Sequence, residues 1–160
     1  MAKKRVYVET SVLSYLTARP SRDAFTLACQ QRTAMWWERR LLWDCFLTPI
    51  VLQEAERGDP VAAAKRLEKA KFLAEFPDPP EAEFLANLLV TRKLVPTGSK
   101  IDAAHLATAA IYGSHYLLTW NQKHLDNLEL CFRIEECIRE QGWTPAKVVT
   151  PERLLSEELP

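Results

Sequence analysis

The sequence is poor in glycine, with 4 among 160 residues, and it contains no Gly-x-Gly-x-x-Gly run and no P-loop. Proteins that cradle nucleotide phosphates in a glycine-rich loop depend on such runs, so this mode of nucleotide binding is disfavoured. The chain also lacks any apolar stretch near the roughly 20 residues that a membrane-spanning helix needs. We therefore expect a protein without a membrane span.

Net charge is lacking as well, because 21 basic residues balance 21 acidic ones. A neutral chain has no whole-molecule field that attracts nucleic acid, so any binding to a polyanion must come from a local patch. The apolar share of 48% and the charged share of 26% are those of an ordinary globular protein. The length fits one domain over residues 1–160.

The few cysteines show no metal or disulfide pattern. Cys29, Cys45, Cys131 and Cys137 form no Cys-x-x-Cys pair and have no histidine nearby at zinc spacing. They are typical of small buried side chains in a reducing compartment. The basic start, residues 1–5, is not followed by the apolar region of a secretory leader, so we expect a cytoplasmic protein.

Apolar runs alternate with helical patterns along the whole chain. We predict strands over residues 5–9, 45–47, 115–121 and 147–149, separated by helices over about 11–16, 21–42, 49–58, 60–73, 81–93, 99–112 and 124–141, with a last helix from 151. Ser21 is the predicted cap of the second helix, and Asp78 with Glu81 matches a capping box. Strands separated by helices predict an α/β fold, a three-layer α/β/α sandwich around a central parallel sheet.

Four polar side chains occupy corresponding places in this pattern. Glu9 ends the first strand and Asn121 ends the third, while Glu54 and Asp102 follow helix starts. Because sites in open parallel sheets form beyond the carboxyl ends of the strands, we expect these four to converge. Three carboxylates and one amide are oxygen ligands, which favour Mg²⁺ or Mn²⁺ over zinc.

Each of these residues also has a structural explanation. Asp102 lies three residues after Ser99 and could complete a capping box, Glu54 could be a solvated helical acid, and Asn121 could be a turn residue. Glu9 is harder to explain in this way, because an apolar strand gives it little access to solvent except at a rim.

The blocks that contain these residues resemble the acidic motifs of PIN domains, in order and spacing, over nearly the whole chain: residues 7–13, 48–54, 100–107 and 117–121. Many bacterial PIN domains are the ribonuclease toxins of VapC-type toxin–antitoxin pairs. The resemblance implies a PIN-like sheet flanked by helices, and a divalent-metal site, Mg²⁺ or Mn²⁺, that cleaves RNA. It also implies an antitoxin partner and a homodimer.

Two positions depart from the PIN pattern. Glu9 and Asn121 stand where the family usually has aspartate, so three negative charges remain, enough for one Mg²⁺. Asp126 could compensate from the next helix or be an exposed acid. Thr10, Ser11 and Thr119 would hydrogen-bond the carboxylates.

The hypothesis for the reaction follows from these roles. Glu9, Glu54 and Asp102 would bind the metal and Asn121 would position the attacking water, leaving a 5′-phosphate and a 3′-hydroxyl. His105 shares a helix face with Asp102 and could support it by a hydrogen bond. The candidate contacts to RNA phosphates are Arg19, Arg22, Lys100 and Lys123, for which solvated surface charge is an equally good interpretation.

Two further interpretations stay open. A degenerate PIN domain could hold RNA or a protein without cutting, and Glu9 and Asn121 favour this alternative; a looser one is a metal-dependent phosphatase or nucleotide-binding domain. Trp36, Trp37 and Trp43 are too many for one buried helix face, so an exposed tryptophan could mark an interface.

Overall fold

Strand β1 (Arg5–Val8) is the centre of a five-stranded parallel sheet, and its Val6, Tyr7 and Val8 have no exposed surface. The computed structural model describes residues 2–122 and 127–158. The sheet order is β3-β2-β1-β4-β5, with β2 at Asp44–Leu47, β3 at Ala74–Glu75, β4 at Tyr116–Leu118 and β5 at Lys147–Val149. Every pairing is parallel, which explains why β1 is apolar on both faces.

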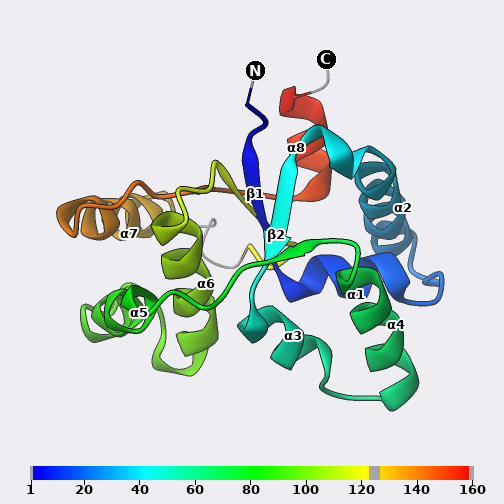
Figure 1. Cartoon of the computed structure of the whole chain (residues 1–160), viewed down its shortest axis with the longest axis horizontal. Coiled ribbons are helices and arrows are strands. Elements are labelled where there is room, and N and C mark those ends of the chain that lie inside the picture. The colour runs from blue at the N-terminus through cyan, green and yellow to red at the C-terminus, as the bar shows by residue number, and fades with distance from the viewer. Residues whose placement is uncertain (1, 123–126, 159–160) are drawn as a thin grey trace.

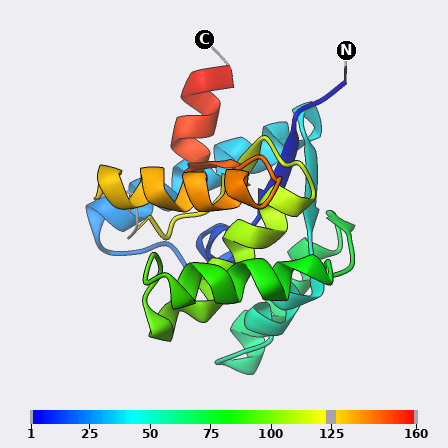
Figure 2. The same cartoon turned by 90° about the vertical axis from the view of Figure 1, so that its left-hand side faces the viewer.

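Helices cover both faces of this sheet (Figures 1 and 2). One layer contains α1 (Thr10–Thr17), α2 (Ala24–Arg39), α4 (Pro60–Ala70) and α8 (Pro151–Glu158). The other contains α5 (Glu81–Thr91), α6 (Lys100–Ile111) and α7 (Leu128–Glu140). Helix α3 (Pro49–Ala55) follows β2 at the carboxyl edge, and the 3-10 turns η1 (Arg40–Leu42) and η2 (Thr97–Ser99) precede β2 and α6. The predicted three-layer α/β/α sandwich is confirmed.

Two predicted helix caps are wrong. Asp23, not Ser21, caps α2, because its carboxylate accepts the N–H of Thr26 at 2.8 Å. The Ser21 hydroxyl instead accepts the N–H of Asp23. Asp78 does not cap α5, which begins after Pro80 without a side-chain cap; its carboxylate accepts the N–H of Ile50 at 3.4 Å. Each polar side chain instead accepts a different backbone N–H, that of Asp23 in the same turn for Ser21 and that of Ile50 in the first turn of α3 for Asp78.

The predicted helix end at Gly142 is confirmed, since α7 ends at Glu140 and Gly142 adopts a positive φ of 88°. The end predicted at Gly58 is too late, because α3 ends at Ala55, although Gly58 also adopts a positive φ of 86°. Strand β3 was not predicted, because it has two residues that are both exposed and shows no apolar alternation. The predicted start of α7 at His124 lies outside the described residues. Among the described helices none is long and apolar enough to cross a membrane.

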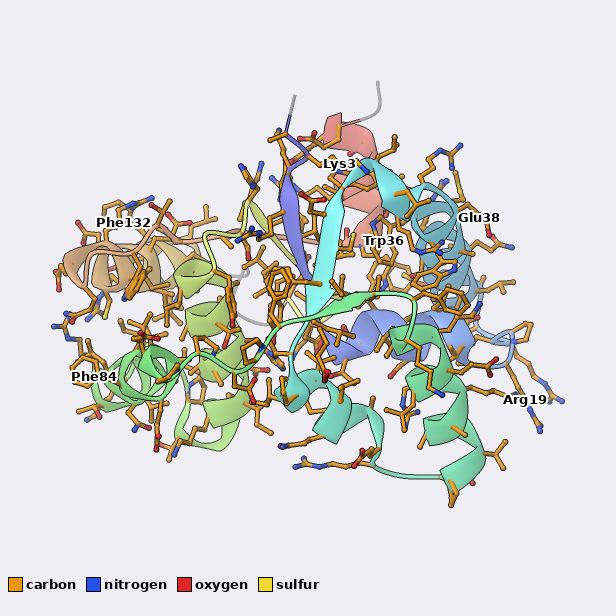
Figure 3. The ribbon with its side chains drawn as sticks, in the orientation of Figure 1. Lys3, Arg19, Trp36, Glu38, Phe84 and Phe132 are labelled. Carbon is orange, nitrogen blue, oxygen red and sulfur yellow. The ribbon has the colours of Figure 1, made fainter. Side chains whose placement is uncertain are left out.

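The three tryptophans around α2 are all buried, so the predicted exposed tryptophan is wrong. Trp36, Trp37 and Trp43 are 0%, 7% and 5% exposed and belong to one core cluster. Figure 3 shows Trp36 between α2 and the sheet. The guanidinium group of Arg40 covers the ring of Trp37 at 4.1 Å, and the edge-on ring of Phe72 covers it as well. Neighbouring side chains thus bury rings that one helix face alone could not.

On the other side of the sheet, small residues let α6 lie close to its neighbours. Ala103, Ala107 and Ala110 are at most 2% exposed and pack against α5 and α7 in a second core cluster. This close packing fixes the position of α6, and with it the two polar residues of its first turns, Asp102 and His105.

Candidate metal centre

Glu9 and Thr119 lie side by side because β1 and β4 are neighbouring parallel strands. Val8 is in register with Leu118, and the N–H of Glu9 donates to the carbonyl oxygen of Leu118 at 3.1 Å. Both strands therefore end at the same edge of the sheet. The residues that follow β1 and β4 therefore lie close together at this edge of the sheet.

The carboxylate of Glu9 is held by three donors on one oxygen. Its Oε1 accepts the N–H of Ser11 at 3.0 Å, the hydroxyl of Thr119 at 2.7 Å and the hydroxyl of Ser11. The bond from the Ser11 N–H makes Glu9 the N-cap of α1. A carboxylate is thus tolerated in the buried segment around residue 9 for two reasons. Glu9 caps a helix, and its Oε1 atom is fully hydrogen-bonded.

Glu54 approaches the same place from the last turn of α3. Its Oε1 accepts the hydroxyl of Thr10 at 3.0 Å and lies 2.6 Å from Nε2 of His105. Burial favours the neutral acid, but the hydrogen bond and charge of His105 and the hydrogen bond of Thr10 outweigh it, so the pKa of Glu54 is below its ordinary value. Glu54 is therefore not the fully solvated helical acid that its local sequence would allow; its side chain is 22% exposed.

His105 is part of this cluster, which the sequence did not reveal. One ligand atom each from Glu9, Glu54 and His105 lie within 4.8 Å of one another. The other ring nitrogen, Nδ1, lies 2.8 Å from the hydroxyl of Tyr7. The expected hydrogen bond to Asp102 is replaced by these contacts, because the ring points across to α3 and β1. The three-residue spacing predicts that Asp102 and His105 share one face of the helix. Which residues this face contacts is determined by the packing of α6 and could not be predicted from the spacing.

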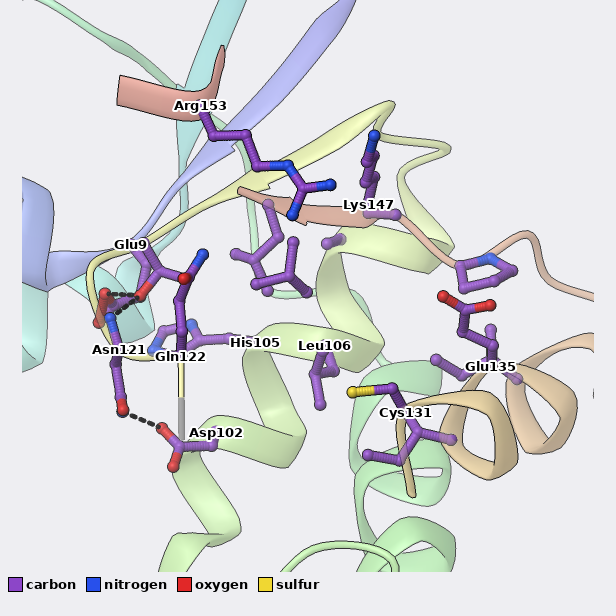
Figure 4. Close-up of a pocket in the computed structure, with 18 of the residues that line it drawn as sticks. Glu9, Asp102, His105, Leu106, Asn121, Gln122, Cys131, Glu135, Lys147 and Arg153 are labelled. Carbon is purple, nitrogen blue, oxygen red and sulfur yellow. Dashed lines mark hydrogen bonds between the residues drawn. The ribbon is translucent and has the colours of Figure 1, made fainter. Parts of the chain in front are cut away.

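Asp102 and Asn121 form the adjoining part of the site (Figure 4). The Asn121 amide donates from Nδ2 to Oδ1 of Asp102 at 3.3 Å. Ser99 makes no side-chain cap bond, so the capping box that could have explained Asp102 is not formed. Asp102 lies outside the group of three ligand atoms within 4.8 Å, yet it lines the same cavity as Glu9 and His105.

This cavity has a volume of about 250 Å³. Glu9, Asn121 and Asp102 lie along one side of it, and α7 forms the opposite side with apolar residues such as Ile134 and Ile138 (Figure 4). Arg153 and Lys147 also line it, and both pair with Glu157, at 2.9 and 2.8 Å. Arg153 was missed, although Thr150-Pro151 after β5 repeats the helix start at Thr48-Pro49 and marks the same edge of the sheet.

The predicted phosphate contacts are dispersed. Lys100 is exposed at the first residue of α6, two positions before Asp102. Arg22 is exposed in the segment before α2, and Arg19 is exposed beyond the far end of α1, where it points outward (Figure 3). Lys123 and Asp126 lie outside the described residues.

The donor set fits a small divalent cation. Two carboxylates of like charge meet in one cluster, and within residues 2–122 and 127–158 neither Glu9 nor Glu54 pairs with a lysine or arginine. Like charges at this separation repel unless a cation lies between them. Carboxylate oxygens of Glu9, Glu54 and Asp102 are the ligands that Mg²⁺ and Mn²⁺ prefer.

Comparison with known proteins supports the fold. No protein-family model matches the sequence, and no curated protein matches it. Among solved structures the chain is similar to the Mycobacterium tuberculosis VapC20 toxin, described as cleaving the sarcin–ricin loop, with a TM-score of 0.58 and 16% identity over 76% of this chain and 93% of the toxin. At this identity the likeness is one of fold. The chain therefore has a PIN-like α/β/α fold.

Proposed function

We propose that this protein is a divalent-metal-dependent endoribonuclease that hydrolyses RNA phosphodiesters. The observation that carries the proposal is the convergence of the Glu9 and Glu54 carboxylates at the carboxyl edge of a parallel sheet, with Asp102 and Asn121 on the cavity that Glu9 also lines. The fold similarity to VapC20 supports it.

In this proposal Glu9, Glu54 and Asp102 hold Mg²⁺ or Mn²⁺. When bound, the metal supplies a Lewis acid that offsets charge on the phosphate and makes water more acidic. Asn121 orients the attacking water, and its bond to Asp102 fixes the amide plane. Hydrolysis joins the water oxygen to phosphorus and breaks the bond to O3′, so the products carry a 5′-phosphate and a 3′-hydroxyl.

The hydroxyl residues around the site act on the carboxylates. Ser11 and Thr119 hold Glu9, while Thr10 holds Glu54. Carboxylates fixed in this way lose little conformational freedom on binding a metal, and loss of such partners typically costs 10–100-fold in metal affinity or activity.

The partners belong to the same proposal. The chain is neutral overall, so RNA phosphates would meet local cations, of which Lys100, two residues before Asp102, and Arg153, on the cavity, are the best placed. VapC20 is described as a toxin, and by analogy this protein would be a toxin too. The resemblance of its motifs to PIN domains further implies an antitoxin partner, a cytoplasmic location and a homodimer.

The test compares Glu54→Gln with Glu56→Gln, a change at an exposed residue directly after α3. Mg²⁺ and Mn²⁺ are titrated into each protein by calorimetry, and cleavage is followed on structured RNAs, one of them a sarcin–ricin loop. We expect Glu54→Gln to lose metal affinity and cleavage at least 10-fold and Glu56→Gln to match the unaltered protein. Equal cleavage by both variants, or cleavage that persists in a chelator, would overturn the proposal.

A second candidate function is favoured by Glu9 itself. Its role as the N-cap of α1 and its three donors on Oε1 would occur in a domain that binds RNA or protein without cutting it. Asn121, which carries no charge, fits this alternative too. Retention of RNA by a protein that binds no metal and makes no cuts would favour the binding module.

A further inference from the structure

A chain of buried polar groups leads away from Glu54 into the core. His105 Nε2 lies 2.6 Å from Glu54 Oε1, His105 Nδ1 lies 2.8 Å from the Tyr7 hydroxyl, and that hydroxyl lies 3.0 Å from Oγ1 of Thr48. Thr48 and Tyr7 are 0% exposed and His105 is 3% exposed. The groups come from α6, β1 and the residue that begins α3, so the chain joins three elements.

The partners of His105 fix which atom carries hydrogen. An ionised carboxylate only accepts hydrogen bonds, so Nε2 must be the donor to Glu54. This is true of the neutral ring and of the imidazolium ion. A ring nitrogen that carries hydrogen has no lone pair for a metal, so His105 is not a ligand while this bond exists, although its Nε2 is close to both carboxylates.

The side chain of Thr48 contacts Tyr7 and does not cap helix α3. It precedes Pro49 at the start of α3, yet its side chain makes no cap bond and turns to Tyr7 instead. Burying three polar groups is costly unless each is satisfied, and apolar residues could fill the same space. Glu54 is the most exposed member of this set of polar groups, since its side chain is 22% exposed.

We infer that His105 is a positioning residue whose Nε2–H holds the Glu54 carboxylate ready for the metal, and that Tyr7 and Thr48 hold the His105 ring. The inference rests on the proposed function, since it assigns Glu54 to the metal. It adds a residue that orients the site from within the core and assigns the histidine a role other than ligation.

Two variants separate the role of the donor from that of the ring. His105→Phe keeps the ring volume and removes the donor, so we expect Mg²⁺ affinity, measured by calorimetry, to fall 10–100-fold. His105→Gln carries an amide N–H at about the reach of Nε2, so it should recover most of the affinity. His115→Gln is the control, because His115 is exposed and its Nδ1 accepts the backbone N–H of Arg5.

A spectroscopic measurement tests the hydrogen position directly. In ¹⁵N-labelled protein without metal, we expect a hydrogen on Nε2 of His105, slow to exchange, whose signal shifts in Glu54→Gln. That hydrogen should remain when Mg²⁺ is added. A ring that loses it and becomes a metal ligand would overturn the inference. If His105→Phe does not fold, Tyr7→Phe serves instead, with an expected loss of affinity of about 10-fold.

The outcomes distinguish this inference from the function on which it rests. An unaltered protein that binds no metal would overturn both. An unaltered protein that binds metal, with equal affinity in His105→Phe or Tyr7→Phe, would overturn the positioning role alone.

Discussion

Thr119 donates its hydroxyl hydrogen to Oε1 of Glu9 across 2.7 Å, and the same hydroxyl accepts the N–H of Asn121 at 2.9 Å. The end of β4 is thereby fastened to the end of β1 through one carboxylate. Ser11 makes the matching contact on the other side, since its hydroxyl bonds Glu9 and accepts the N–H of Trp120 at 2.9 Å. The Glu9 carboxylate, through Thr119 and Ser11, therefore holds the loop segment 119–121 in place.

Replacing Thr119 by valine should loosen this loop without changing side-chain volume. Thr119 is 4% exposed, so the change leaves buried hydrogen-bonding groups without their partner and should lower the free energy of unfolding by about 1–3 kcal/mol. Metal affinity should fall as well, because Glu9 loses a donor. Urea unfolding and calorimetry measure the two effects.

Thr17→Val is the matched control, since the Thr17 hydroxyl donates to the carbonyl oxygen of Leu13 within α1 and joins no second element among the described residues. It should change the unfolding free energy by no more than about 0.5 kcal/mol. Equal losses in the two variants would show that the contact between Thr119 and Glu9 contributes nothing specific.

The sheet and its carboxyl edge could be predicted because topology determines them. Parallel strands must end at one edge, so Glu9 and Asn121 were placed near each other by their positions after strands alone. Whether the carboxylates of the site form a metal centre or act as helix caps depends on side-chain contacts, and these contacts are determined by how the helices pack. Whether Glu54 meets His105 is decided by how α3 and α6 pack on the sheet, which no local pattern contains.

The same limit applies to caps and short strands. Ser21 and Asp23 are both good cap residues two positions apart, and the backbone at the start of α2 decides between them. Strand β3 depends on its pairing with β2, since its two exposed residues have no pattern of their own. Such features follow from tertiary contacts.

The buried position of Trp36 predicts a large loss of stability on truncation. Trp36 has no exposed surface, so Trp36→Ala would leave a cavity and should lower the free energy of unfolding by about 3–5 kcal/mol. Phe25 is an aromatic residue in the same helix that is 78% exposed, and Phe25→Ala should have little effect. Urea unfolding of both variants checks this, and a mild effect at Trp36 would contradict its placement in the core.

The close approach of α6 to its neighbours predicts that larger side chains will not be accommodated there. Ala107 has no exposed surface in the cluster formed with α5 and α7, so Ala107→Leu should lower the free energy of unfolding by about 1–3 kcal/mol. Ala64→Leu, on the exposed side of α4, is the control and should be nearly neutral. Thermal or urea unfolding compares the two. A stable Ala107→Leu protein would show that α6 has room to move, which is inconsistent with a firmly held Asp102 and His105.

The attachment of α8 predicts a loss of stability in acid. Glu158 accepts hydrogen bonds from Lys4 at 2.6 Å and from Tyr116 at 2.5 Å, and these contacts hold the pKa of the Glu158 carboxyl below its ordinary value. A carboxyl whose pKa is lower in the folded protein than in the unfolded chain stabilises the fold fully above the unfolded value, about 4.3. That contribution is lost as the pH falls from there through the folded pKa.

Glu158→Gln removes the charge and should remove the part of the acid sensitivity that this carboxyl provides. We expect the variant to be less stable than the unaltered protein at about pH 6 and the difference to shrink at about pH 3.5. Urea unfolding at both values measures the difference, and Glu68→Gln, at an exposed position of α4, is the control. A difference that stays constant over this range would mean that the carboxyl titrates alike in the folded and unfolded chains. The contacts with Lys4 and Tyr116 would then not anchor the C-terminal helix through charge.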